Sequence, residues 1–170
     1  ILFKCKILVK DVYPVLKKFE FPATIFVITD YVDAKDPGFM NWNEIVQVSR
    51  DGIAIGSHSK SHYLFDKRMD VQQAMEELIG SKKNIESKIG RPVEYFCYSS
   101  GAFCDKAKLL VKQAGYKGAC TTNRGFVKFN RDVYELKRIK VTNGDAIRPF
   151  SFWFKLSGYY TVFKKSINPS

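Results

Sequence analysis

The 170-residue chain holds only two histidines, His58 and His62, and its four cysteines form no CxxC pair. The lack of such pairs excludes zinc fingers and the usual thiol redox motif, and leaves the compartment undecided. The longest apolar stretches, such as residues 23–28, are too short to span a bilayer. The first residues lack the pattern of a signal peptide, and the chain does not begin with methionine.

Acidic residues are scarce. The chain has 17 acidic and 28 basic residues, and its net charge is +11. Such a surplus favours anionic partners. The basic residues are scattered along the chain, and no zinc-finger or RNA-binding signature accompanies them. We therefore expect solvated helix faces and no nucleic-acid partner.

The hydrophobic pattern alternates helices with short strands rich in β-branched and aromatic residues. Strands are expected over residues 22–29, 52–58, 93–98, 117–121 and 136–141. Helices are expected over residues 11–19, 42–50, 71–89 and 106–114, with Asp11, Asn41, Asp70 and Asp105 as their N-caps. This alternation predicts a single α/β domain over residues 1–170 with a parallel sheet, open or closed into a barrel.

The C-terminal segment, residues 148–170, is rich in aromatic and basic residues. One interpretation is an amphipathic helix that makes peripheral contact with a membrane surface or binds a partner. The other is a terminal helix that covers the sheet, because aromatic side chains often anchor cores. The sequence favours the second interpretation.

His58 and His62 stand four residues apart, at the end of the predicted strand 52–58. Two neutral imidazoles at this spacing can converge on one divalent metal ion, such as zinc. A solvated histidine pair is the alternative, but sites in parallel α/β folds gather where strands end. Two ligands do not complete a catalytic site, which usually needs three protein ligands and an open position.

Several segments follow, in order, the motifs of one family: residues 13–19, 22–27, 40–42, 56–62, 95–103, 114–116 and 120–123. Residues 56–62 contain its metal-binding H-[ST]-x-x-H motif, and residues 95–103 are similar to its third motif. On these segments the chain resembles the NodB-homology polysaccharide deacetylases (carbohydrate esterase family four), from about residue 9 to about residue 156.

The resemblance implies a distorted (β/α) barrel, incomplete at the N-terminus, that hydrolyses N-acetyl groups on amino-sugar glycans. In such enzymes an Asp and two His hold a divalent metal, often zinc, a second Asp activates water, and a backbone N–H supports the oxyanion. Transferred to this chain, His58 and His62 are the metal ligands and Ser100 supplies the N–H. Trp42 and Tyr98 are candidates to line the sugar groove, with core packing an equal alternative. Family habit points to the cell envelope.

The chain departs from the family pattern where the carboxylates belong. The first family motif, T-F-D-D-G-Y, falls on residues 4–9, where both Asp are missing and Lys6 places a cation at the metal position. The Pro-Tyr of the third motif is Ser99-Ser100, and no third histidine exists for the late Leu-x-His motif. These changes bring the hydrolytic activity into question.

Three explanations stay open for the missing carboxylates. The chain is a pseudoenzyme that binds glycan without cleaving it, or a truncated copy of an active deacetylase. In the third, another acid serves, with Asp30 and Asp145 as candidates because both follow predicted strands. We predict a polysaccharide-deacetylase-like domain with N-acetylated glycan as its partner.

Overall fold

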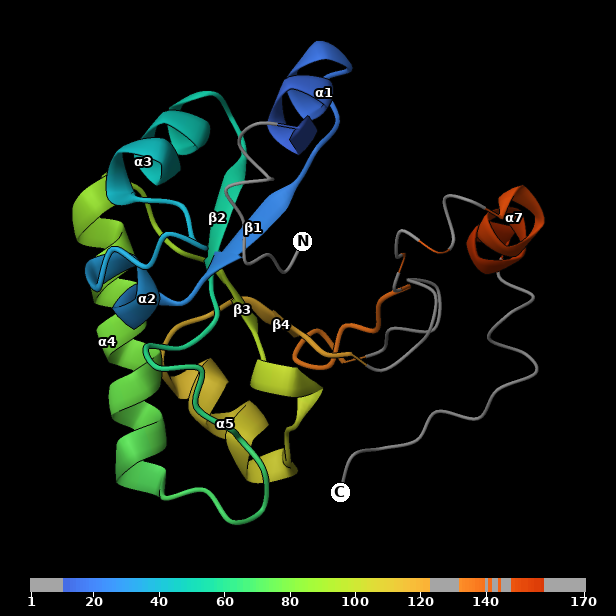
Figure 1. The fold of residues 1–170 in the computed structure, drawn as a ribbon. Coiled ribbons are helices and arrows are strands. Elements are labelled where there is room, and N and C mark those ends of the chain that lie inside the picture. The colour runs from blue at the N-terminus through green and yellow to red at the C-terminus, as the bar shows by residue number, and fades with distance from the viewer. Residues whose placement is uncertain (1–10, 123–131, 140, 142–143, 145–147, 158–170) are drawn as a thin grey trace.

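The structure is a computed structural model that describes residues 11–122, 132–139, 141, 144 and 148–157. Its sheet is parallel and has the strand order β1-β2-β3-β4 (Figure 1). The strands are β1 (Thr24–Val27), β2 (Ala54–Ser57), β3 (Tyr95–Cys97) and β4 (Gly118–Cys120). Each strand pairs with its neighbour in sequence, as in (β/α) barrels and without the reversal of order that marks doubly wound sheets. The predicted α/β class and parallel sheet are confirmed.

The helices of the described chain alternate with these strands. They are α1 (Tyr13–Lys18), α2 (Thr29–Asp33), α3 (Trp42–Arg50), α4 (Val71–Ile89), α5 (Asp105–Gln113) and α7 (Pro149–Ser157). Helix α4 packs against α2, α3, α5 and β2, and Figure 1 shows it running along one side of the sheet. The longest helix therefore supports the strand that leads into the histidine motif.

Local signals set the helix ends at three positions as predicted. The Asn41 side chain accepts a bond from the Glu44 N–H, and the Glu44 carboxylate accepts one from the Asn41 N–H, which completes a capping box for α3. Asp70 caps α4 through the Gln73 N–H, and Gly90 ends it in the left-handed conformation.

Two predicted caps are wrong. Val12 occupies the N-cap of α1 without a side-chain bond, because residues 11 and 12 already form a helical turn. Cys104 occupies the N-cap of α5, which makes Asp105 the first helical residue. In the first turn its carboxylate still lies favourably near the positive end of the helix dipole.

The core lies between the sheet and its helices and is dominated by aromatic side chains. Phe65, Phe96 and Tyr98 are fully buried and meet edge to face, with Phe65 and Phe96 centroids 5.2 Å apart. Tyr116 is buried beside Phe96, and its hydroxyl donates to the Leu78 carbonyl of α4 at 2.9 Å. Burial of each such ring stabilises the fold by about 2 to 3 kcal/mol, which fixes β3 against α4.

The C-terminal part differs from its prediction. In place of the strand 136–141, the described residues make one parallel bridge, between Leu136 and Cys120. In α7 the side chains of Phe150 and Trp153 are 77% and 58% exposed, so the expectation that this segment covers the sheet is wrong for these residues. Residues 158–170 lie outside the described residues. Within the described part of the chain, no helix has the length and apolar character that a membrane span requires.

Candidate functional site

The histidine motif begins where β1 and β2 end side by side. Val27 pairs with Ser57 in the parallel ladder, and the next N–H, that of His58, donates to the Val27 carbonyl at 2.8 Å. The last backbone bond of the sheet edge therefore fixes the start of the loop 58–62. This edge is the one at which parallel α/β folds carry their sites.

His58 is almost fully buried, and its ring has one defined partner. Its Nδ1 lies 2.5 Å from the Cys97 carbonyl oxygen at the end of β3. Because a carbonyl oxygen only accepts, Nδ1 carries the proton and Nε2 keeps a free lone pair. Burial lowers the pKa of His58 to about 4, so the ring is neutral at pH 7. A neutral imidazole held through Nδ1 by a carbonyl is the usual form of a histidine metal ligand.

His62 comes back beside His58 through a tight loop. The two rings meet edge to face with centroids 4.9 Å apart. Ser59 and His62 have φ values of 63° and 69°, in the left-handed region that non-glycine residues rarely adopt. The two unusual residues curl the loop back on itself and bring the two rings side by side.

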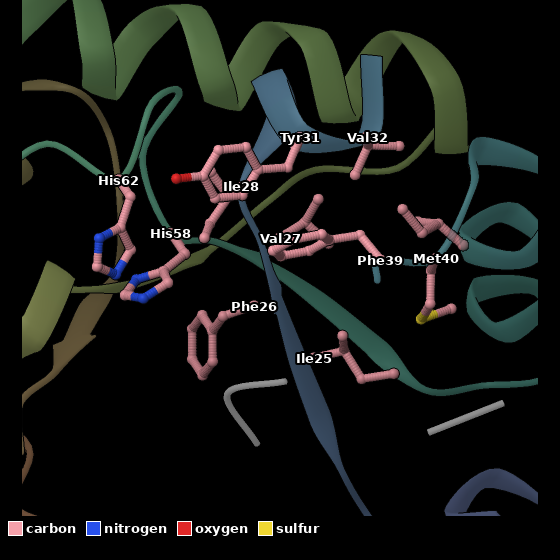
Figure 2. Close-up of a pocket in the computed structure, with 11 residues that line it drawn as sticks. Ile25, Phe26, Val27, Ile28, Tyr31, Val32, Phe39, Met40, His58 and His62 are labelled. Atoms are coloured by element: carbon pink, nitrogen blue, oxygen red, sulfur yellow. The ribbon is translucent and has the colours of Figure 1, made fainter. Parts of the chain in front are cut away.

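A cavity of about 230 Å³ lies beside the pair, with both histidines in its wall (Figure 2). The rest of its wall comes from β1, α2 and the residues around the start of α3, and it is apolar apart from the Tyr31 hydroxyl. These residues are Ile25, Phe26, Val27, Ile28, Tyr31, Val32, Phe39, Met40 and Ile45. The histidine nitrogens and the Tyr31 hydroxyl are therefore the main polar side-chain groups of its wall.

The residues present fit a divalent metal only in part. Two neutral imidazoles supply nitrogen ligands, but among the described residues no group of three or more His, Cys, Asp and Glu could hold an ion. Asp30 lies in the first turn of α2 rather than at the strand end, and its N–H donates to the Lys60 carbonyl at 3.0 Å. Asp30 is thus beside the histidine loop without completing a ligand set. Asp145 and the replaced first motif lie outside the described residues.

Ser100 lies at the same edge, in the turn Ser99–Gly101 that follows β3. Its φ is 54° and its side chain is exposed, while its carbonyl accepts a bond from Thr122 Oγ1 at 3.4 Å. Two buried hydroxyls near the strand ends, Thr29 Oγ1 and Ser99 Oγ, have no hydrogen-bond partner among the described residues. Such orphaned polar atoms at a sheet edge are consistent with a site that takes a ligand.

Tyr98 and Trp42, the two aromatic residues proposed to line a sugar groove, both lie outside the wall of this cavity. Tyr98 is fully buried, its hydroxyl donates to the Tyr134 carbonyl at 3.1 Å, and burial raises the pKa of its phenol. Trp42 donates from Nε1 to the Asp33 carboxylate at 2.8 Å. In this structure Tyr98 takes the packing role, and Trp42 joins α3 to α2.

Sequence reasoning missed Glu77, a carboxylate on α4 that is only 7% exposed. It contacts the histidine loop at Lys60 and Ser61. The available signal was its register, because it shares the buried stripe of α4 with Ala74, Leu78, Ser81 and Ile85. An acid in such a stripe needs a partner, since buried charges are paired or hydrogen-bonded.

The comparisons with known proteins agree on one family. The family model described as polysaccharide deacetylase matches residues 6–119. YxkH of Bacillus subtilis (strain 168), a protein assigned to the polysaccharide deacetylases, is 27% identical over 135 residues, which are 79% of this chain and 47% of YxkH. The chain thus spans about half the length of that relative.

Two solved proteins of lower identity have the same fold. Streptococcus pyogenes deacetylase PplD, solved with acetate, superimposes with a TM-score of 0.77 at 21% identity, over 82% of this chain and 62% of its own. A mutant of BA3943, a CE4 family pseudoenzyme, superimposes with a TM-score of 0.58 at 18% identity, over 65% of this chain and 38% of its own. Another solved mutant of BA3943 is described as having restored enzymatic activity.

Proposed function

Because this chain belongs to the polysaccharide deacetylase family, we propose that it binds N-acetylated amino-sugar glycans at a divalent-metal site built on His58 and His62. We propose zinc as the metal, because neutral imidazole is one of its usual ligands. The observation that carries the proposal is the ring of His58, buried and neutral with Nδ1 tied to the Cys97 carbonyl. That arrangement leaves Nε2 available beside His62.

The reaction that we propose is hydrolysis of the N-acetyl group. A bound divalent metal supplies Lewis acidity, which lowers the pKa of a coordinated water and polarises a carbonyl. The Cys97 carbonyl would orient the His58 ring, and the apolar wall of the cavity would lie beside both imidazoles. The Ser100 backbone N–H is the candidate donor to the oxyanion, and Asp30 is the candidate acid because its peptide joins the histidine loop.

A second function, glycan binding without hydrolysis, is favoured by the sequence at residues 4–9. Lys6 stands where the family has a carboxylate. The pseudoenzyme BA3943 is a precedent for a protein of this fold without activity. In this case the domain would keep the cavity and the imidazoles as a recognition surface.

One experiment separates the two functions. The purified chain is loaded with zinc, its metal content is measured by mass spectrometry, and acetate release and binding are followed with chito-oligosaccharides. Bound zinc with acetate release supports the deacetylase, and bound glycan without acetate supports the binding protein. The double variant His58→Ala/His62→Ala should take up no zinc, whereas Lys60→Ala, an exposed change in the same loop, should take up as much as the wild type.

Uptake of zinc by the double histidine variant would contradict the site assignment. Asp30→Asn tests the candidate acid. If Asp30 takes part in hydrolysis, this variant should release no acetate and should take up as much zinc as the wild type.

We also propose peripheral membrane contact through the exposed aromatic side chains of α7, because Phe150 and Trp153 are exposed beside a basic residue, Lys155.

A further inference from the structure

The loop that carries the two histidines needs an external support. Ser59 and His62 are both left-handed, and this conformation costs a non-glycine residue about 1 to 2 kcal/mol. Such backbone persists only where the surrounding structure over-determines it. Lys60 and Ser61 lie between the two unusual residues, so the contacts of these two peptides decide whether the turn holds its shape.

Glu77 makes those contacts from α4. Its Oε2 accepts from the backbone N–H of Lys60 and of Ser61, both at 2.8 Å. Its Oε1 accepts from the Ser61 hydroxyl at 2.7 Å. Three bonds to one buried carboxylate are charge-assisted, and each is stronger than a neutral hydrogen bond. The carboxylate therefore holds the middle of the turn through hydrogen bonds to Lys60 and Ser61.

Two further contacts, from α2 and from a second position on α4, hold the same loop. The Lys60 carbonyl accepts from the N–H of Asp30 at 3.0 Å, so this one residue is held at its nitrogen by α4 and at its oxygen by α2. At the base of the loop the Ser57 hydroxyl lies 2.7 Å from the Ser81 hydroxyl, one helical turn after Glu77. Helix α4 thus contacts the loop at its base and at its tip, while packing against β2.

We propose that Glu77 is a positioning residue that fixes the turn 59–62 and so sets the angle at which the His62 ring meets His58. It does not join the two histidines as a third ligand, because no group of three His, Cys, Asp and Glu among the described residues could hold an ion. This inference rests on the proposed metal site, where it predicts that cation affinity depends on a carboxylate that does not touch the cation. Loss of such supporting groups typically weakens metal binding 10- to 100-fold.

The test compares Glu77→Ala and Glu77→Gln with Glu76→Ala, a matched change of the adjacent, exposed acid on the same helix. Zinc affinity is measured by calorimetry, and exchange of the Lys60 and Ser61 amides is measured by NMR in metal-free protein. We expect Glu77→Ala to weaken zinc binding at least tenfold and to speed exchange of both amides. We expect Glu77→Gln to lie between it and the wild type, since an amide oxygen still accepts, and Glu76→Ala to match the wild type.

Wild-type affinity and wild-type exchange in Glu77→Ala would overturn the inference. If Glu77→Ala does not fold, Glu77→Gln decides, because unchanged exchange of the two amides in it would overturn the proposal and faster exchange would support it. If the wild type binds no zinc, the proposed metal site fails on its own. The exchange data then still decide whether Glu77 holds the turn.

Discussion

The Nδ1 atom of His58 lies 2.5 Å from the carbonyl oxygen of Cys97, so one imidazole ties the loop after β2 to the last residue of β3. The bond satisfies a polar atom that burial would otherwise leave without water. It also selects the tautomer, because the carbonyl can only accept. Structural support and readiness to bind a ligand thus come from the same contact.

Acid should destabilise the metal-free protein through His58. Its pKa is about 4 in the folded protein, against 6.5 for the free side chain, so the unfolded chain takes up a proton first as the pH falls. The stabilising contribution is complete above pH 6.5 and is lost toward pH 4. Between pH 7 and pH 5 we expect a loss of about 2 kcal/mol in the free energy of unfolding from this group.

Urea denaturation with a chelator present, at both pH values, measures the loss caused by His58. The variant His58→Asn lacks the titrating ring and should lose less stability than the wild type over the same interval. Equal losses in the two proteins would show that other groups carry the acid sensitivity.

Gly101→Ala should destabilise the turn that holds Ser100. Gly101 has φ +74°, and an added Cβ would lie 1.9 Å from Thr122 Oγ1. Gly90 at φ +67° has open space around it, so Gly90→Ala is the matched control for conformation alone. We expect about 1 to 2 kcal/mol from Gly90→Ala and at least about 1 kcal/mol more from Gly101→Ala by chemical denaturation. Equal effects would mean that Thr122 moves away freely.

Tyr98→Phe should reduce stability and leave glycan binding intact. The change removes the bond from the phenol to the Tyr134 carbonyl, which is worth about 1 kcal/mol, and keeps the ring in the core. Thermal unfolding and glycan titration on the same sample check the two halves of this prediction. A Tyr98→Phe variant with wild-type stability and weaker glycan binding would show that the Tyr98 hydroxyl contacts the sugar.

Trp42→Phe should weaken the contact between α3 and α2. The Asp33 carboxylate accepts from Trp42 Nε1 and from Asn84 Nδ2, both at 2.8 Å, and so links three helices. We expect a loss of about 1 kcal/mol in stability, with glycan affinity unchanged in a parallel titration. Asn84→Ala should show a similar loss, because it removes the other bond to the same carboxylate.

The aromatic side chains of α7 should bind anionic vesicles. Co-sedimentation with vesicles that contain phosphatidylserine should recover the wild type and lose the double variant Phe150→Ser/Trp153→Ser. Leu109→Ser is the control, since Leu109 is 61% exposed on a different helix. Equal sedimentation of wild type and double variant would remove α7 from membrane contact.

The sequence predicted those parts of the fold that depend on neighbours in the chain. The Asn41 cap of α3 and the Asp70 cap of α4 are short-range signals that tertiary contacts did not alter. The closeness of the His58 and His62 rings agrees with their spacing in the sequence. The placement of Tyr98 did not follow from the sequence, because an aromatic after a strand suits a core and a groove equally well.

The register of Glu77 on α4 indicates that it is buried, but the sequence does not indicate what it contacts. Its partners lie 16 and 17 residues earlier in the chain, and only the packing of α4 on β2 brings them together. Asp105 shows a different kind of error. It is a good capping residue, but it lies one position inside its helix. Boundaries shift by a residue when the chain enters the helix earlier than the side chain suggests.

The strand order β1-β2-β3-β4 has a consequence for how the chain is made. Each strand after β1 finds its partner already synthesised, with one or two helices of the described chain between them. We expect the sheet to grow by single additions as the polypeptide leaves the ribosome, without a long wait for a distant partner. The histidine loop follows β1 and β2, but the His58 ring can bond the Cys97 carbonyl only after β3 has joined the sheet.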